Sequence, residues 1–238
     1  MPDVYAHIVF ADIVAGRLGL NLDKSLLYFG SQGPDIIGFM FPSLSGQMHD
    51  GDALLLEKLA GDEKLFPVYI GYHTHFSLDN RLHPIIKSHS PTLKTHLLIE
   101  SCLDQIIVQK YWKKELCLLK MDDYIPVTIP DYISTTLDTI INAEFSFKLP
   151  EQFWKSALEN YFRIYKEALE GKSDVVISYS EYPQKTLEDL LGLNDFRKLT
   201  DAFGNAVEEE TLSLSSCIKL KKPSSLKNTP MPLDLSHR

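Results

Sequence analysis

Two neighbouring segments of this chain each pair a histidine with a carboxylate four residues later. The first segment, GYHTHFSLDNRLHP at residues 71–84, contains His75 and Asp79, and the second contains His96 and Glu100. Residues four apart on a helix lie one turn apart on the same face, which is the placement that two ligands of one metal ion require. Imidazole and carboxylate groups, without a thiolate, are the ligands expected of a catalytic zinc site, because structural zinc sites favour cysteine.

The histidines of the first segment are not equivalent. A helix rotates by about 100° per residue, so His73 and His75 point about 200° apart and cannot serve one site on the same helix. We therefore expect His75 to be the ligand and His73 to pack in the fold. His83 directly precedes Pro84, and a proline disfavours the helical conformation of the residue before it. We expect the helix to end there and His83 to turn inward, which gives the pattern H-x-x-x-D-x-x-x-H.

The second pair falls on an apolar stripe that also carries Leu93, Leu103 and Ile107. Burying an unpaired carboxylate costs several kcal/mol, so His96 and Glu100 should be paired, hydrogen-bonded or bound to a metal ion. A single pair of this kind on a helix is more often a salt bridge. Two pairs so close together favour the metal interpretation.

The remaining histidines have plainer interpretations. We expect His89 to be structural and His237 to lie in a disordered tail. The doublet His49-Asp50 is also typical of HD-type metal phosphohydrolases, another helical class, but a two-residue motif is weak evidence and leaves the downstream pairs unexplained.

Composition bounds the class of protein. The 238 residues are 44% hydrophobic and 24% charged, as in soluble globular proteins, and no apolar run is long enough for a membrane span. The net charge of −8 argues against a basic nucleic-acid-binding surface, although nucleic acid held by a metal ion stays open as a substrate. The three cysteines fit neither a disulfide framework nor a Cys-x-x-Cys zinc site. The amino-terminal residues lack a basic region and a cleavage site, which predicts a cytoplasmic protein.

The candidate ligands are predicted to lie on or between helices. Apolar residues recur at spacings of three and four, and this periodicity predicts helices over residues 3–19, 64–82, 91–119, 130–146 and 151–170. We expect Ser90 and Pro91 to begin the third of these helices and Pro150 the last. Residues 30–35 and 41–46 are predicted to be loops that wrap a site. The fold class is therefore all-α, with the metal cluster between helices of a multi-helix bundle.

One domain should account for most of the chain. We expect a single helical domain over residues 1–220, followed by a disordered tail over residues 221–238, which is rich in proline, serine and lysine. Residues 174–183 could form a short extended segment.

Five segments, taken in their order along the chain, resemble one known family. They are MPDVYAHIVFAD, GSQGPDI, QMHDG, GYHTHFSLDNRLHP and HLLIE. Together they resemble the zinc-dependent phospholipase C family, whose all-helical fold is shared with single-strand-specific zinc nucleases. The resemblance covers about residues 1–110, and the last third of the chain has no counterpart.

The resemblance implies a cluster of up to three zinc ions and hydrolysis of a phosphodiester by activated water. The first site would use Asp35, His49, His75 and Asp79, the second His83, His96 and Glu100, and the third His7 with a bridging Asp79. Asp35 would also be the general base. The substrate would be a lipid or small-molecule phosphodiester, with transient contact to a membrane surface.

The chain departs from the family pattern at two places. Secreted members supply a zinc ligand from a processed amino terminus, usually a tryptophan, and the interval between Asp79 and His83 is shorter here. Two alternatives therefore stay open. One is a binding or scaffold protein in which zinc only holds helices together. The other is a zinc nuclease, for which Tyr28, Phe29, Phe39 and Phe41 are the candidate base-stacking residues because they flank Asp35.

Overall fold

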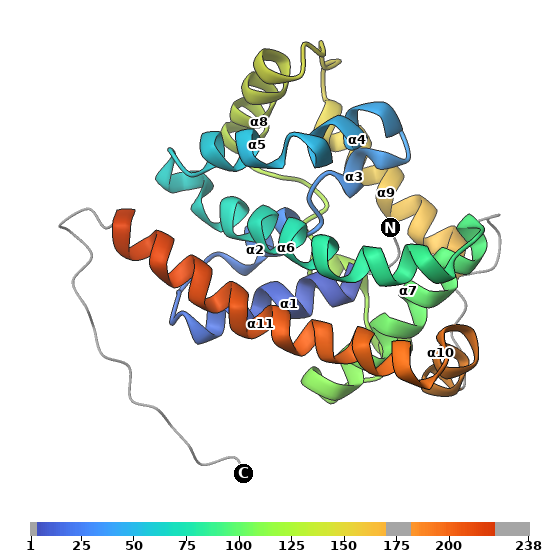
Figure 1. Ribbon diagram of the computed structural model, residues 1–238. Coiled ribbons are helices and arrows are strands. Elements are labelled where there is room, and N and C mark those ends of the chain that lie inside the picture. Colours follow the sequence, from blue (N-terminus) through green and yellow to red (C-terminus); the bar gives the residue numbers. More distant parts are fainter. Residues whose placement is uncertain (1–3, 170–181, 222–238) are drawn as a thin grey trace.

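The all-α prediction is confirmed by the computed structural model, which describes residues 4–169 and 182–221 (Figure 1). Within these ranges the chain forms eleven α-helices and no strand. They are α1 (Val4–Arg17), α2 (Lys24–Ser31), α3 (Asp35–Gly38), α4 (Pro42–Asp50), α5 (Asp52–Leu59), α6 (Phe66–His89), α7 (Leu93–Ile107), α8 (Asp131–Glu144), α9 (Phe153–Leu169), α10 (Pro183–Leu191) and α11 (Leu193–Lys221). Short 3-10 turns lie at η1 (Glu63–Leu65), η3 (Leu116–Leu118) and η4 (Met121–Asp123), and a π-turn, η2 (Val108–Trp112), follows α7. Among the described helices, none is both long and apolar enough to cross a membrane.

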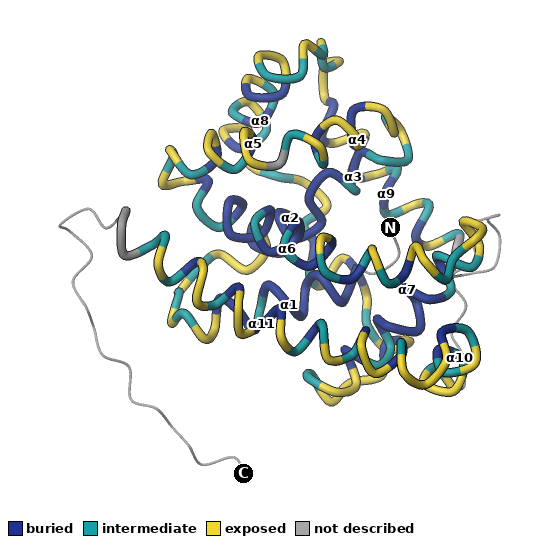
Figure 2. The backbone as a smooth tube through the Cα atoms, viewed as in Figure 1, coloured by how far each residue is buried: buried dark blue, intermediate teal, exposed yellow. Residues whose placement is uncertain are grey.

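Helix α6 lies at the centre of the molecule. It packs against α1, α2, α5, α7 and α11, and its buried side chains, such as Ile70, Phe76 and Leu82, point to more than one side. Figure 2 shows that α1, α2 and α6 contain long stretches of buried chain. A helix enclosed in this way can bring several neighbours to one point along its length.

Helices α2 and α6 touch through glycine. A Cβ on Gly71 would lie 2.6 Å from the backbone carbon of Gly30, and a Cβ on Gly30 would lie 2.5 Å from the carbonyl oxygen of Val68. Any larger residue at either position would force the two backbones apart. The close crossing brings the last turn of α2, including Ser31, against the part of α6 that carries His75.

Helix α6 does not end at Pro84, in contrast to the prediction. It continues to His89, and His83 stays inside the helix. A proline within a helix removes one hydrogen bond, so the continuation must be supported by packing. Helix α11 supplies that support on both sides of the proline, because Arg81 Nη2 donates to Glu209 at 2.7 Å and His89 Nε2 contacts Asp195 at 3.0 Å.

Several other predicted boundaries were wrong. The predicted helix 91–119 begins instead at an N-cap formed by Thr92, which accepts from the Thr95 N–H at 3.1 Å, and it stops at Ile107 where the π-turn starts. Helix α9 begins at Phe153 rather than at Pro150. The predicted loop 41–46 falls mostly in α4, where proline occupies the first turn and starts a helix rather than a turn.

The longest helix, α11, was not predicted. Its apolar residues Phe196, Leu199, Phe203 and Val207 recur at helical spacing and are buried, so the signal was present in the sequence. The expected tail lies outside the described residues except for Lys221, the last residue of α11. The extended segment 174–183 also lies outside them, apart from Tyr182 and Pro183, which precede and begin α10.

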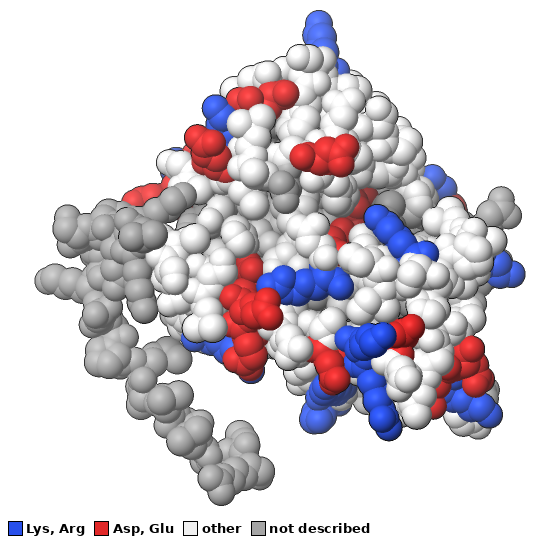
Figure 3. Space-filling model, viewed as in Figure 1, with Lys and Arg blue, Asp and Glu red and all other residues white. Residues whose placement is uncertain are grey.

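Helix α11 runs antiparallel to α6, and three ion pairs connect the two helices. His73 pairs with Glu210, Arg81 with Glu209 and His89 with Asp195. Figure 3 shows acidic and basic side chains close together on this face of the molecule. These pairs account for two of the histidines outside the metal-ligand set.

Candidate metal centre

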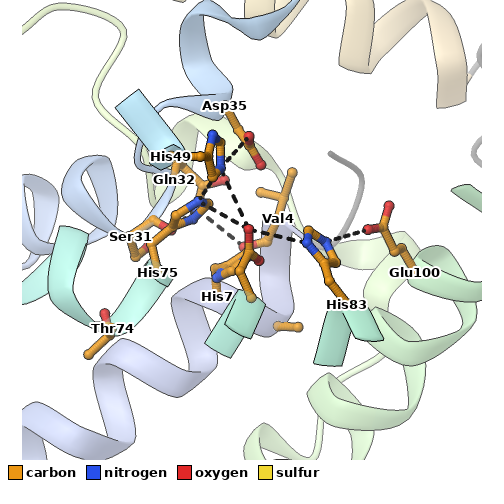
Figure 4. A network of polar contacts seen from close by, with 12 residues as sticks. Val4, His7, Ser31, Gln32, Asp35, His49, Thr74, His75, His83 and Glu100 are labelled. Carbon is orange, nitrogen blue, oxygen red and sulfur yellow. Dashed lines mark hydrogen bonds and ion pairs between the residues drawn. The ribbon is translucent and has the colours of Figure 1, made fainter. Parts of the chain in front are cut away.

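All eight predicted ligands converge beside α6, in three groups. Figure 4 labels His7, Asp35, His49, His75, His83 and Glu100 among them. The groups are His7, His75 and Asp79; Asp35, His49 and His75; and His83, His96 and Glu100. In each group the candidate ligand atoms lie within 4.8 Å of one another. Helices α1, α3, α4, α6 and α7 contribute, so the centre joins parts of the chain that are distant in sequence.

The spacing of ligand atoms in the second group matches the edges of a metal coordination shell. His49 Nε2 lies 3.2 Å from His75 Nε2 and 3.6 Å from Asp35 Oδ1. Four ligands placed about 2.0–2.1 Å from a tetrahedral zinc ion lie about 3.3–3.4 Å from one another. The observed separations therefore suit one ion among these atoms.

Backbone carbonyls set the tautomers of His49 and His75. His75 Nδ1 donates to the carbonyl oxygen of Ser31 at 3.1 Å, and His49 Nδ1 donates to that of Ser45 at 2.8 Å. Each ring therefore keeps its Nε2 lone pair for another partner, as metal-bound histidines do. The two Nε2 atoms face each other, and two lone pairs at that distance repel unless a proton or a metal cation lies between them.

Asp79 is the common partner of the imidazoles. Its Oδ1 lies 3.1 Å from His7 Nε2. Its Oδ2 lies 3.6 Å from His49 Nε2, 3.5 Å from His75 Nε2 and 3.5 Å from His83 Nδ1. Oδ2 is buried and has no hydrogen-bond partner in the described part of the chain. A buried carboxylate oxygen left in this state is costly, and a metal ion is the partner that would satisfy it.

Burial and neighbouring charges shift the pKa values of these groups in different directions. Complete burial lowers the pKa of His75 to about 4, and the charge of Asp79 opposes only part of that effect. Burial would also lower the pKa of His49, but Asp79 and Asp35 outweigh it and raise the net value. Burial alone would raise the pKa of Asp79, yet the surrounding imidazoles, His75 first, hold it well below its usual range. A neutral His75 beside an ionised Asp79 is the state that binds metal.

The third group is built around Glu100, whose side chain is fully buried. Its Oε1 lies 3.2 Å from His83 Nε2 and 2.7 Å from His96 Nε2. The hydroxyl of Ser90 hydrogen-bonds His96 Nδ1 at 3.2 Å and orients that ring. His83 contacts both Glu100 and Asp79 and so connects this group to the others; Figure 4 shows the contact of His83 with Glu100.

His7 is positioned by contacts at the start of α1. The carboxylate of Asp104, on α7, accepts from the N–H groups of Tyr5 and Ala6 at 3.2 and 2.7 Å. An acidic group at this end satisfies orphan N–H groups and complements the helix dipole. The His7 ring then stacks on that of His75, with centroids 4.3 Å apart.

Gly33 makes room for His75. Its φ of +54° is a conformation that favours glycine, and a Cβ there would lie 2.6 Å from His75 Cδ2. The turn between α2 and α3 therefore needs glycine for two reasons. It joins Ser31, whose carbonyl oxygen contacts His75, to Asp35 at the start of α3.

Sequence reasoning missed the residues that support the ligands. Backbone carbonyls, such as those of Ser31 and Ser45, can be supplied by any residue type, so no sequence motif reveals them. The carboxylate of Asp104 lies outside the ligand motifs. Tyr72 lies one turn before His75 on α6, and its buried hydroxyl has no hydrogen-bond partner among the described residues. Burial raises the Tyr72 pKa, and the charge of Asp35 adds to the effect, so the two groups are near each other.

His73 points away from the centre, toward Glu210 on α11. It is thus a charge partner of a buried carboxylate rather than an apolar packing residue. His89 contacts Asp195, in keeping with a structural role, and His237 lies outside the described residues.

The centre is buried on one side and open on the other. The side chain of His75 is fully buried, whereas that of His49 is 30% exposed and that of Asp35 is 13% exposed. Solvent can therefore reach the Asp35 and His49 side, and this is where a reacting molecule could enter.

No family model, curated protein or solved structure matches the chain. The resemblance to the zinc-dependent phospholipase C family therefore rests on the motifs quoted above, and the function has to be argued from the geometry of the centre.

Proposed function

We propose that the protein is a zinc-dependent phosphodiester hydrolase of the phospholipase C type. The observation that carries the proposal is the buried Asp79 Oδ2, which faces three imidazole nitrogens at 3.5–3.6 Å without a hydrogen bond. An arrangement of this kind is costly for a chain that only needs to fold, and it suits a chain that binds metal ions.

Zinc is the ion that this set of ligands favours. Imidazole nitrogen and carboxylate oxygen without thiolate are typical of catalytic zinc. In such a site zinc supplies Lewis-acid chemistry, withdrawing charge from phosphoryl oxygens and making water more acidic. Up to three ions could be held, one in each group, with His75 shared between two of the groups.

Asp35 is the residue we assign to proton transfer. Its Oδ1 lies 3.6 Å from His49 Nε2 on the open side of the centre, where water and a phosphodiester could approach together. A carboxylate there can orient the attacking water and accept its proton. The buried His75 and Asp79 would hold the geometry fixed, and the carbonyl acceptors behind the imidazoles would keep the rings from rotating.

The substrate class follows from the resemblance and from the charge of the chain. We propose a small-molecule or lipid phosphodiester, met in the cytoplasm and, for a lipid, during transient contact with a membrane surface. A net charge of −8 repels anionic polymers, so nucleic acid is a less favoured partner.

Two observations bear on the alternatives. A zinc nuclease needs exposed rings for base stacking, and Tyr28 and Phe29 are buried at 6% and 0% exposure, while the Phe41 ring packs against that of Phe147. A scaffold needs closed metal sites, and the 30% exposure of His49 instead favours a site with an open position.

The proposal is tested by a panel of three substrates, namely a chromogenic phosphodiester, phosphatidylcholine and single-stranded nucleic acid. We expect the zinc-loaded protein to hydrolyse the chromogenic ester and one natural class, and chelation to abolish the activity. His75→Ala should lower the rate by about 100-fold or more, as loss of a metal contact does. His73→Ala is the matched control, since it removes an imidazole from the same helix outside the centre.

Asp35→Asn keeps a side-chain oxygen at this metal-ligand position and removes the carboxylate that would accept the proton. We expect this variant to retain the ions bound by the other residues and to lose hydrolysis. Hydrolysis that persists in Asp35→Asn and in His75→Ala, or after chelation, would contradict the proposal.

A further inference from the structure

A cleft of about 600 Å³ lies between the end of α7 and the start of α10, and the metal-binding groups do not reach it. One wall is formed by Gln109, Lys110 and Lys113, and the other by Tyr182, Gln184 and Lys185. Ile106, the first residue of α7 that lines the cleft, lies about 240° around the helix axis from Glu100. The cleft and the third metal-ligand group therefore lie on different faces of α7. A volume of this size is typical of sites for small molecules.

The cleft concentrates positive charge in an acidic chain. Its lining contains three lysines and one acid, Glu188, whereas the whole chain carries −8. Among the described residues none of these three lysines forms an ion pair, while Lys24 and Lys58 elsewhere do, at 2.9 and 3.1 Å. Three ammonium groups outnumber the single carboxylate around this cleft, and the excess of positive charge favours an anion.

The acid in the cleft offsets one of the three positive charges, which leaves a net charge of +2 (three lysines minus one glutamate). Glu188 Oε1 already accepts a hydrogen bond from Gln184 Nε2 at 2.9 Å. Tyr182, which is 68% exposed, also lines the cleft.

The backbone of the first wall departs from the helix at this point. The π-turn η2 replaces the regular α-helix over Val108–Trp112, and Lys113 follows with a φ of +56°. A side chain in the left-handed region is unfavourable, because its Cβ crowds the backbone, and glycine would avoid this cost. Single π-turns and left-handed non-glycine residues occur frequently at functional sites. Here they bring Lys110 and Lys113 to the same cleft.

We propose that this cleft binds the phosphate group of a small phosphorylated polyol, either free or as the head group of an anionic lipid. Lysines bind phosphate as point charges, with several donors each. The side-chain amides of Gln109 and Gln184 and the hydroxyl of Tyr182 would hydrogen-bond the hydroxyl groups of the polyol. The site is independent of the metal centre, so its failure and that of the proposed function are distinguishable.

Calorimetric titration with inositol 1-phosphate tests the proposal on the zinc-loaded full chain. We expect Lys110→Ala and Lys185→Ala each to weaken binding by about fivefold, the change that corresponds to roughly 1 kcal/mol per lysine. Lys113→Gly should weaken binding equally while keeping or raising the melting temperature, because glycine relieves the left-handed backbone. The binding that these lysine variants weaken should persist in His75→Ala, because the lining of the cleft contains none of the metal-binding residues. Any binding that His75→Ala alone removes belongs to the metal centre.

Lys114→Ala is the matched control. Lys114 is the neighbour of Lys113, but its Nζ donates to the Tyr124 hydroxyl at 3.2 Å and is not part of the cleft lining. We expect its removal to change binding by less than about twofold. The proposal is overturned if the wild type binds no inositol 1-phosphate, or if Lys114→Ala weakens binding as much as Lys113→Gly does.

Vesicles distinguish the two sources of the ligand. Co-sedimentation with phosphatidylcholine vesicles that contain phosphatidylinositol, but not with phosphatidylcholine alone, would identify the lipid head group. Binding of inositol 1-phosphate in the calorimeter, without co-sedimentation with either kind of vesicle, would identify the free phosphorylated polyol as the ligand. Absence of both would overturn the proposal.

Discussion

Asp79 is surrounded by four imidazoles, from His7, His49, His75 and His83, at 3.1–3.6 Å. Asp79 carries one negative charge, and Asp35 and Glu100 each face one of these rings as well, so four protonated rings would still leave excess positive charge. Neutral rings whose lone pairs converge on the same small volume need a cation instead. The chemistry of the centre thus follows from a charge balance at one residue.

Acid should destabilise the metal-free chain through His75. Its pKa falls from 6.5 to about 4 on folding, so between those pH values the unfolded chain binds a proton that the folded chain does not. The free energy of unfolding therefore decreases as pH falls through this window, by up to about 3 kcal/mol. His49 acts in the opposite sense: its raised pKa adds stability that is present below pH 6.5 and is lost as pH rises through the folded pKa.

Urea unfolding of the metal-free protein at a series of pH values measures this dependence. We expect greatest stability near pH 6.5, where the two histidine effects meet. His75→Gln should flatten the decline on the acid side. An acid limb of equal slope in wild type and His75→Gln would show that another group is responsible.

Tyr72 provides a second prediction at the scale of one residue. Its buried hydroxyl lacks a hydrogen-bond partner among the described residues, which costs roughly 1–3 kcal/mol. Tyr72→Phe should therefore raise the free energy of unfolding of the metal-free protein. A loss of stability in a denaturant titration would mean that the hydroxyl is already satisfied.

The crossing of α2 and α6 is the element-scale feature on which the centre depends. Gly71→Ala would push the backbone of Gly30 away and draw the Ser31 carbonyl from His75. We expect a loss of about 1–3 kcal/mol in the free energy of unfolding, together with weaker zinc binding.

Gly16→Ala is the control for this substitution. Gly16 lies in α1, and a methyl group added there would have no neighbouring atom within 4 Å, so alanine should be neutral or stabilising by up to about 1 kcal/mol. Equal effects of the two substitutions on zinc affinity would argue that the crossing does not set the ligand geometry.

Local periodicity predicted the elements better than it predicted their ends. The pairs His75 with Asp79 and His96 with Glu100 fall on helices, as the spacing of four predicts. The continuation of α6 past Pro84 was not predictable, because it depends on contacts with α11, which is distant in sequence. Local helix propensity carries no information about contacts with a distant helix.

At the scale of the whole molecule, metal binding and folding should be coupled. Five helices supply the ligands, and an ion that binds only the folded chain stabilises it by about 4 kcal/mol at a concentration about 1,000 times its dissociation constant. We expect chelation to lower the melting temperature by many degrees and zinc to restore it. A melting temperature that does not respond to either would contradict this coupling.

The long-range part of the centre was predictable only through the family resemblance. His7, Asp35 and His49 lie on three different helices, and no spacing rule connects them to His75. Their convergence depends on Gly33, on the α2–α6 crossing and on the capping of α1 by Asp104. These are tertiary contacts. In the sequence the residues that make them are isolated glycines and one aspartate, which form no recognisable motif.

The zinc content of the purified chain shows whether the residues around Asp79 form a metal centre. The protein would be reconstituted with zinc, desalted and measured by elemental mass spectrometry, together with His75→Ala and His73→Ala. We expect two or three zinc ions per wild-type chain, at least one fewer in His75→Ala, and no loss in His73→Ala. Fewer than one ion per wild-type chain, or equal zinc in wild type and His75→Ala, would contradict it.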